Sequence, residues 1–95
     1  MTYKLKFLPS AKKEWDKLDN SIKSQFKCKL EKCLENPHSP ANRLAGFDCV
    51  YKIKLRSAGY RLVYEVDDQE IIVFVIAVGK RENNTVYDKA RDRTR

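Results

Sequence analysis

The chain has 95 residues, of which 20 are Lys or Arg and 13 are Asp or Glu, so its formal net charge is +7. This length predicts a single domain over residues 1–95 and excludes two independently stable cores, because so short a chain buries only roughly 60–65% of its unfolded surface. No apolar run approaches the ~20 residues of a membrane helix, and the N-terminus lacks the apolar segment of a signal peptide. We therefore expect a cytoplasmic protein with no membrane partner.

The first half of the sequence predicts one strand and two helices. Residues 2–8 alternate apolar side chains with lysines, which is typical of a half-buried strand. A proline then opens a helix over residues 10–18, and Asn20 or Ser21 caps a second helix that runs to about Glu35. We expect these two helices to form an antiparallel hairpin.

The second half predicts three strands and a short final helix. The strands cover about Cys49–Arg56, Tyr60–Val66 and Ile71–Val78, Gly79 stops the last of them, and the helix covers residues 83–91. The third of these strands is apolar on both faces, so it should lie centrally with cover on each side. The predicted fold is α+β: a two-helix hairpin packed on one face of a four-stranded, mostly antiparallel sheet, with a short C-terminal helix.

The strands over Cys49–Arg56 and Tyr60–Val66 are predicted to form a hairpin, and this hairpin brings side chains of like charge onto one face. A tight turn puts Arg56 opposite Arg61 and Lys52 opposite Glu65, with Lys54 between them, and any even loop length keeps all five on one face. Like charges in opposed positions cost up to ~1 kcal/mol per pair. Lysines that protect a sheet edge explain part of this face, but a strand paired on both sides needs no such protection. Together with the net charge, the pattern favours a face that binds a polyanion.

Basic residues and one aromatic residue follow the last strand. Lys80 and Arg81 leave the sheet beside Arg61, and Tyr87 comes about two helical turns later. Cations beside an aromatic ring suit a single-stranded nucleic acid, which offers phosphates and base faces. Packing of its own helix onto the sheet is an equally good explanation for Tyr87.

The usual catalytic constellations are missing from the sequence. It has no Ser/His/Asp set, paired carboxylates, glycine-rich phosphate loop or metal-ligand cluster, and its one histidine, His38, is predicted to be a solvated loop residue. We expect no cofactor and no metal, and we expect Cys28, Cys33 and Cys49 to be reduced, small apolar fillers. RNA carries its own nucleophile in the 2′-OH, so the protein need supply only proton transfer, charge neutralisation and orientation. A lysine among other cations has a lowered pKa and can approach a general base.

The combination of segments resembles a known family. VYKIKLRSAGYRLVYEV and VGKRENNTVYDKA, with KEWDKL and ENPHSPANRLAG upstream, are similar over nearly the whole chain to the RelE toxins of bacterial type II toxin–antitoxin systems. The resemblance implies a ribosome-dependent, metal-independent endoribonuclease that enters the A site of the 70S ribosome, beside 16S rRNA. There it cuts mRNA and leaves a 2′,3′-cyclic phosphate and a 5′-hydroxyl. It also implies a RelB-like antitoxin that wraps the toxin, with operator DNA bound only through that complex.

The resemblance also implies which residues carry the catalysis. They are Lys52, Lys54, Arg61, Arg81 and Tyr87. In the family picture the two lysines serve as general base and stabilise the activated 2′-oxygen. Arg61 holds the phosphate, Arg81 acts as the acid toward the leaving 5′-oxygen, and Tyr87 stacks on the mRNA. Because the pKa of an arginine exceeds about 12, charge stabilisation is the alternative role for Arg81.

Three further basic residues, Arg43, Arg56 and Lys80, are expected to contact RNA. Ala45 stands before Gly46 where RelE-like chains usually carry a basic residue, which predicts a weaker RNA contact at this point. Two alternatives stay open. One is a ParE-like toxin that acts on DNA gyrase, and the other is an inactive module that binds RNA or the ribosome.

Overall fold

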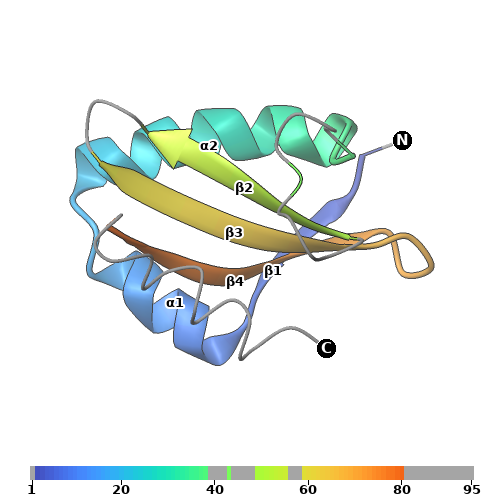
Figure 1. Cartoon of the computed structure of the whole chain (residues 1–95), viewed down its shortest axis with the longest axis horizontal. Helices are drawn as coiled ribbons and strands as arrows, with labels where there is room; N and C mark the ends of the chain where they lie inside the picture. The colour runs from blue at the N-terminus through green and yellow to red at the C-terminus, as the bar shows by residue number, and fades with distance from the viewer. Residues whose placement is uncertain (1, 39–42, 44–48, 56–58, 81–95) are drawn as a thin grey trace.

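The computed structural model of the chain describes residues 2–38, 43, 49–55 and 59–80 (Figure 1). The elements are β1 (Lys4–Phe7), α1 (Pro9–Asp16), α2 (Asn20–Glu35), β2 (Val50–Leu55), β3 (Tyr60–Asp67) and β4 (Ile72–Lys80). Their order and the single sheet confirm the predicted α+β fold. The C-terminal helix predicted over residues 83–91 lies outside the described residues.

The four strands form one mixed sheet in the order β1-β4-β3-β2. β1 pairs with β4 in parallel, and the other two pairs are antiparallel, so the prediction of a mostly antiparallel sheet is confirmed. The apolar β4 is central, as expected. The prediction that Gly79 ends this strand was wrong, because Gly79 pairs with Arg61 and Lys80 pairs with Tyr60. Glycine lacks a side chain but keeps both backbone groups that a ladder needs.

The register of the β2–β3 hairpin differs by two residues from the predicted one. Lys54, and not Arg56, lies opposite Arg61, because the turn takes up four residues between Leu55 and Tyr60. Its last residue, Gly59, has a φ of 71° and donates its N–H to the carbonyl of Leu55 at 2.8 Å. Side chains alternate along a strand with a period of two, so the shift leaves the described residues of β2 and β3 on their predicted faces.

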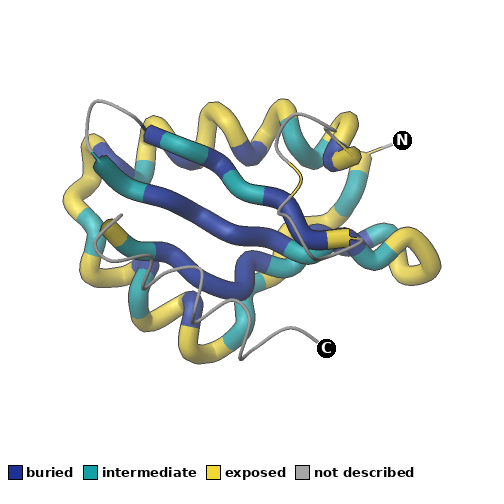
Figure 2. Tube along the Cα trace, viewed as in Figure 1, coloured by how far each residue is buried: buried dark blue, intermediate teal, exposed yellow. Residues whose placement is uncertain are grey.

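Both helices cover the same face of the sheet and bury the main core there (Figure 2). The ring centroids of Trp15 and Phe26 are 6.1 Å apart where the two helices meet, and Phe7 lies 5.3 Å from Trp15. The core consists of Ala11, Trp15, Ile22, Phe26 and Leu30 from the helices and Tyr51, Ile53, Leu55, Leu62, Tyr64, Val66, Val73, Val75 and Val78 from the strands. Neither helix is both long and apolar enough to cross a membrane.

A β-bulge changes the direction of side chains in β4. The register with β3 shifts between Val63 and Tyr64, so Ile76 is an extra residue without its own partner. As a result Val75 and Val78 both face the helices although they are three residues apart.

The face of the sheet turned away from the helices has its own small apolar cluster. It contains Val50, Val63, Ile76 and Ala77, with Leu8 and Phe74 packed against it. Burial of β4 on both faces was the expectation from its composition. Phe74, in the middle of the apolar β4, therefore contributes to this second cluster and not to the main core.

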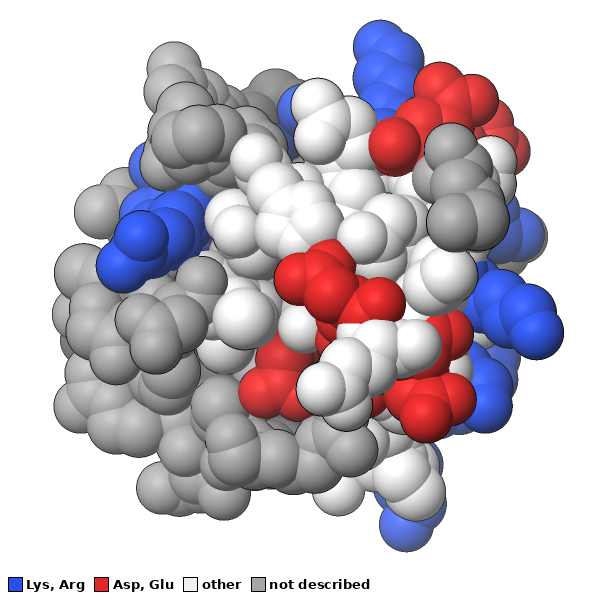
Figure 3. All heavy atoms as spheres, turned by 90° about the vertical axis from the view of Figure 1, so that its right-hand side faces the viewer, with Lys and Arg blue, Asp and Glu red and all other residues white. Residues whose placement is uncertain are grey.

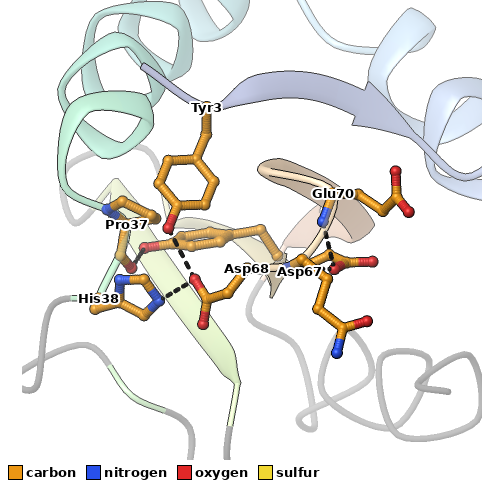
Figure 4. A network of polar contacts seen from close by, with 8 residues as sticks. Tyr3, Pro37, His38, Asp67, Asp68 and Glu70 are labelled. Atoms are coloured by element: carbon orange, nitrogen blue, oxygen red, sulfur yellow. Dashed lines mark hydrogen bonds and ion pairs between the residues drawn. The ribbon is translucent and has the colours of Figure 1, made fainter. Parts of the chain in front are cut away.

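A polar network ties together three segments that are distant in sequence (Figure 4). Asp68 Oδ1 accepts a hydrogen bond from the Tyr3 hydroxyl at 2.8 Å and lies 2.8 Å from His38 Nε2 in an ion-pair contact. The Tyr64 hydroxyl donates to the carbonyl of Pro37 at 3.0 Å. The hydrogen bond to Asp68 raises the pKa of Tyr3. His38 is exposed but is not simply solvated, since it joins the chain after α2 to the β3–β4 turn. This correction to the prediction depends on a contact between residues 30 positions apart, which the sequence does not show.

The three cysteines are free thiols in different surroundings. Cys33 is half-buried against the main core, and burial raises its pKa. Cys28 and Cys49 are exposed. The prediction of three apolar fillers therefore holds for Cys33 alone.

Candidate nucleic-acid interface

The basic side chains of β2 lie on the face turned away from the helices. Because Tyr51 and Ile53 face the main core, the alternation along β2 places Lys52 and Lys54 on the other side of the sheet. Arg61 of β3 pairs with Lys54, so it lies on that same face. We call these three residues, Lys52, Lys54 and Arg61, the cationic face.

Arg61 is the buried charged residue of the part of the chain that the structure describes, with 6% of its surface exposed. Its Nη1 donates to the carbonyl of Tyr60 at 2.9 Å, and its Nε has no hydrogen-bond partner within that part. A buried donor without a partner costs about 1–3 kcal/mol. The guanidinium donors form a planar fork that matches the oxygens of a carboxylate or phosphate. The geometry therefore suits a bound anion at this point.

The register partners of Arg61 bring no carboxylate to its charge. On β4 its register partner is Gly79, which has no side chain to fill the adjacent position. On β2 its partner is Lys54, a second cation. Two like charges in opposed positions repel, and a bound anion relieves that repulsion. Because Gly79 was predicted to end the strand, the sequence analysis did not identify it as the partner of Arg61. A glycine inside an otherwise apolar strand often marks a place where another group approaches the backbone closely, and this pattern could have indicated the site.

Charge is distributed unevenly along β3. Arg61 lies near its start, Glu65 in its middle and Asp67 at its end, about 20 Å from Arg61 at the rise of a strand. Figure 3 looks onto the end of the molecule that carries the β3–β4 turn, where acidic side chains gather. Asp67 Oδ1 accepts the backbone N–H groups of Gln69 and Glu70 in that turn, both at 3.1 Å. An approaching polyanion is thus repelled from this end and attracted toward the β2–β3 turn.

Two other predicted RNA contacts lie apart from the cationic face. Lys80 pairs with Tyr60, which faces the helices, and its Nζ lies 6.0 Å from the Tyr60 ring centroid. Arg43 forms an isolated bridge with Tyr51 beside the outer edge of β2 and is exposed. Because Tyr51 faces the helices, its bridge partner Arg43 lies on that side of the edge of β2, and Lys80 lies at the end of the same face. The remaining predicted residues, Arg56, Arg81 and Tyr87, and the departure at Ala45 lie outside the described residues.

A metal centre has no candidate within residues 2–38, 43, 49–55 and 59–80. No three His, Cys, Asp or Glu side chains there come together in a group that could hold a metal ion. The side chains of the cationic face themselves offer charge stabilisation by Arg61 and proton transfer by a lysine.

Comparison with known proteins assigns the chain to a family. Residues 5–85 match the family model described as the ParE toxin of the type II toxin–antitoxin system parDE. A putative RelE-like toxin protein of Escherichia coli is 53% identical over 95 residues, with both chains fully covered. The mRNA interferase toxin RelE of E. coli strain K12 is 53% identical over 90 residues, which is 95% of each chain.

Solved structures agree with this assignment. The free state of an E. coli RelE double mutant superposes with a TM-score of 0.93 at 50% identity, and all of both chains is covered. RelE in the intact E. coli RelBE toxin–antitoxin complex superposes with a TM-score of 0.82 at 53% identity, covering 85% of this chain and 99% of that one. The RelBE2 complex of Mycobacterium tuberculosis, at 19% identity and a TM-score of 0.68, shares the fold.

Proposed function

The chain belongs to the ParE-toxin family of type II toxin–antitoxin systems as a RelE-like toxin, and from this premise we propose that it is an mRNA interferase. It is an endoribonuclease that inhibits translation by cutting mRNA in the ribosomal A site. A RelB-like antitoxin neutralises it, and operator DNA is reached only through the toxin–antitoxin complex.

The observation that carries this proposal is the buried Arg61 with its unpartnered Nε, directly opposite Lys54. In the reaction the 2′-oxygen of the substrate attacks the adjacent phosphorus, and the bond from phosphorus to the 5′-oxygen breaks. The guanidinium of Arg61 binds the phosphate and neutralises the charge that develops on it. Lys52 or Lys54 accepts the proton of the 2′-OH and stabilises the activated oxygen.

The remaining roles fall to residues outside the cationic face. Arg81 stabilises the leaving 5′-oxygen or protonates it, and Tyr87 stacks on a base of the mRNA and orients the strand. Arg43 lies beside β2, where it can contact a phosphate that follows the bound one. Arg56 and Lys80 add further contacts to the backbone.

Dependence on the ribosome follows from the weakness of the acid–base groups. A lysine and arginines without a carboxylate or histidine pair give little proton transfer by themselves, so positioning of the substrate has to supply much of the rate. We expect the ribosome to hold the mRNA in the reactive geometry and naked mRNA to be cut poorly. Rapid cleavage of naked RNA at neutral pH would contradict this.

The decisive experiment adds purified protein to programmed 70S ribosomes and maps the mRNA ends by primer extension. A-site cuts should appear, should vanish in Arg61→Ala, and should persist in Lys29→Ala, which removes an exposed lysine of α2 away from the cationic face. Arg61→Lys keeps the charge without the fork and should retain only a small part of the activity.

The same preparation tests the two alternatives. The match to the ParE family model makes a gyrase inhibitor the second candidate, so a DNA supercoiling assay runs in parallel. Intact mRNA with inhibited gyrase would overturn the interferase in favour of that candidate. Ribosomes occupied by the protein with uncut mRNA would overturn it in favour of a binding module.

A further inference from the structure

Glu14 is an acidic residue on the side of α1 that packs on the sheet. Ala11 and Trp15, four residues apart, are buried in the main core, and Glu14 lies three residues after Ala11, so it shares their side of the helix. Its side chain is half-buried. A carboxylate that leaves water is costly unless it accepts hydrogen bonds. The position of Glu14 therefore requires a hydrogen-bond donor nearby.

The backbone of β4 supplies this donor. β1 pairs with β4 as far as Val75, whose carbonyl accepts the N–H of Leu8 at 3.0 Å, and α1 begins directly after. Within the described part of the chain, no strand continues this pairing on the same side of β4 over residues 76–80. There Val78 donates its N–H to Glu14 Oε1 at 3.3 Å, and α1 lies beside β4 in Figure 1.

The β-bulge in β4 makes this contact possible. Backbone groups of a strand alternate in direction, so without the extra residue Val75 and Val78 would point to opposite sides of β4. The bulge turns both of them to the side of α1. It also leaves the backbone of Gly79 directed toward β3, where Gly79 pairs with Arg61. Glu14 and β3 thus hold consecutive residues of β4 from opposite sides.

We propose that Glu14 is a positioning residue for the nuclease reaction, an inference that rests on the proposed function. By holding the N–H of Val78 where β1 has ended, Glu14 fixes Gly79 against Arg61 and so fixes the guanidinium that binds the phosphate. Glu14 lies on the helix side of the sheet, so it acts through the backbone of β4 and not on the substrate. Misplacement of a reacting group by about 1 Å can lower a rate about 100-fold.

Two variants separate the hydrogen bond from the charge. Glu14→Ala removes the acceptor and suits a helix, whereas Glu14→Gln keeps a carbonyl oxygen in its place without the charge. The assay is single-turnover cleavage on programmed 70S ribosomes at saturating protein. Glu14→Ala should lower the rate constant by about tenfold, and Glu14→Gln should stay within about twofold of the native rate. The half-saturating protein concentration should not change, because the cationic face keeps its charges.

The matched control is Asp16→Ala. It removes an exposed carboxylate from the same helix, where Asp16 pairs with Lys12 at 3.3 Å, and it should cleave at the native rate. A loss of stability alone would lower the fraction of active protein and hence the amplitude of cleavage, and it would leave the rate constant at saturation unchanged. The rate constant therefore distinguishes a positioning role from a merely structural one.

Hydrogen exchange of the isotopically labelled full chain, followed by NMR without ribosomes, tests the contact itself. The Val78 amide should exchange about tenfold faster in Glu14→Ala than in the native chain, because it loses its acceptor. The Val66 amide, which donates to the carbonyl of Cys49 at 2.9 Å, should exchange as it does in the native chain.

The proposal is overturned if Glu14→Ala cuts mRNA at the native rate or leaves the exchange of the Val78 amide unchanged. It is also overturned if Glu14→Gln is as slow as Glu14→Ala, since the charge and not the hydrogen bond would then matter. Uncut mRNA with the native chain would instead overturn the proposed function. In that case the exchange of the Val78 amide would still decide whether Glu14 holds the end of β4.

Discussion

Lys54 of β2 lies directly opposite Arg61 of β3, so two cations occupy one position of the ladder on the face away from the helices. Arg61 is buried there with an unpartnered Nε. Opposed like charges and a buried donor without a partner both lower stability. A site that binds an anion explains why both features are present, since a bound phosphate removes both costs at once.

Because Lys54 and Arg61 are cations in opposed positions, we predict that removing the charge of Lys54 raises the stability of the protein and lowers its activity. Lys54→Met should raise the free energy of unfolding by about 0.5 kcal/mol because it removes a like-charge pair, and it should reduce mRNA cleavage on ribosomes. Urea unfolding and primer extension measure the two quantities. Lys52→Met is the matched control, since Lys52 lies opposite Val63 and its loss should leave stability closer to that of the native chain. A Lys54→Met variant that is less stable than Lys52→Met would contradict the interpretation.

The turn that sets the register depends on Gly59. Its φ of 71° lies in the left-handed region, and no atom lies within 4 Å of the position that a Cβ would take. Gly59→Ala should therefore cost about 1 kcal/mol through backbone conformation alone, and Gly59→Asn should cost less because asparagine tolerates this conformation. Denaturant unfolding of the two variants measures the difference. Equal losses for Ala and Asn would argue for a steric cause.

Alkaline pH should unfold the protein through its buried tyrosines. Burial raises the pKa of Tyr64 far above its ordinary value and that of Tyr51 in the same direction. The folded state therefore holds protons that the unfolded state releases near pH 10. This contribution to stability is fully present below that pH and is lost as the pH rises above it, by about 1.4 kcal/mol per pH unit for Tyr64.

The variant Tyr64→Phe isolates the contribution of one hydroxyl. Between about pH 10 and 11.5, its free energy of unfolding should fall less steeply, by roughly 1.4 kcal/mol per pH unit, than that of the native chain. The control Phe26→Leu alters the core without a titratable group, so it should lower stability equally at every pH. An unchanged slope in Tyr64→Phe would show that this hydroxyl does not remain protonated in the folded state.

Association with ribosomes should weaken steeply with salt, because the proposed function has the cationic face bind phosphates. Each phosphate contact to a single strand contributes about −0.7 to the slope of the logarithm of affinity against the logarithm of salt concentration. Replacing Arg61 with alanine should make the slope shallower by about one contact. Binding to ribosomes that carry a non-cleavable 2′-O-methyl mRNA, measured between 50 and 300 mM salt, supplies the slope. A response that is flat in the native chain would exclude phosphate contacts as the main source of affinity.

Some of the site could be predicted because it depends on periodicity alone. The alternation of Lys52, Ile53 and Lys54 determines their faces whatever the register, so the two-residue error in the hairpin did not move any of them. The length of the turn before Gly59 and the bulge at Ile76 could not be predicted, because they depend on how the strands fit their neighbours.

The amino-acid sequence by itself determined which side chains share a face, which strands and helices form within the part of the chain that the structure describes, and that β4 is buried on both sides, because these follow from local periodicity and composition. Only the tertiary structure decided that Arg61 is buried beside Gly79 and opposite Lys54, that His38 binds Asp68, and that Glu14 accepts the N–H of Val78. These features arise from contacts between residues distant along the chain, and local periodicity carries no information about such pairs.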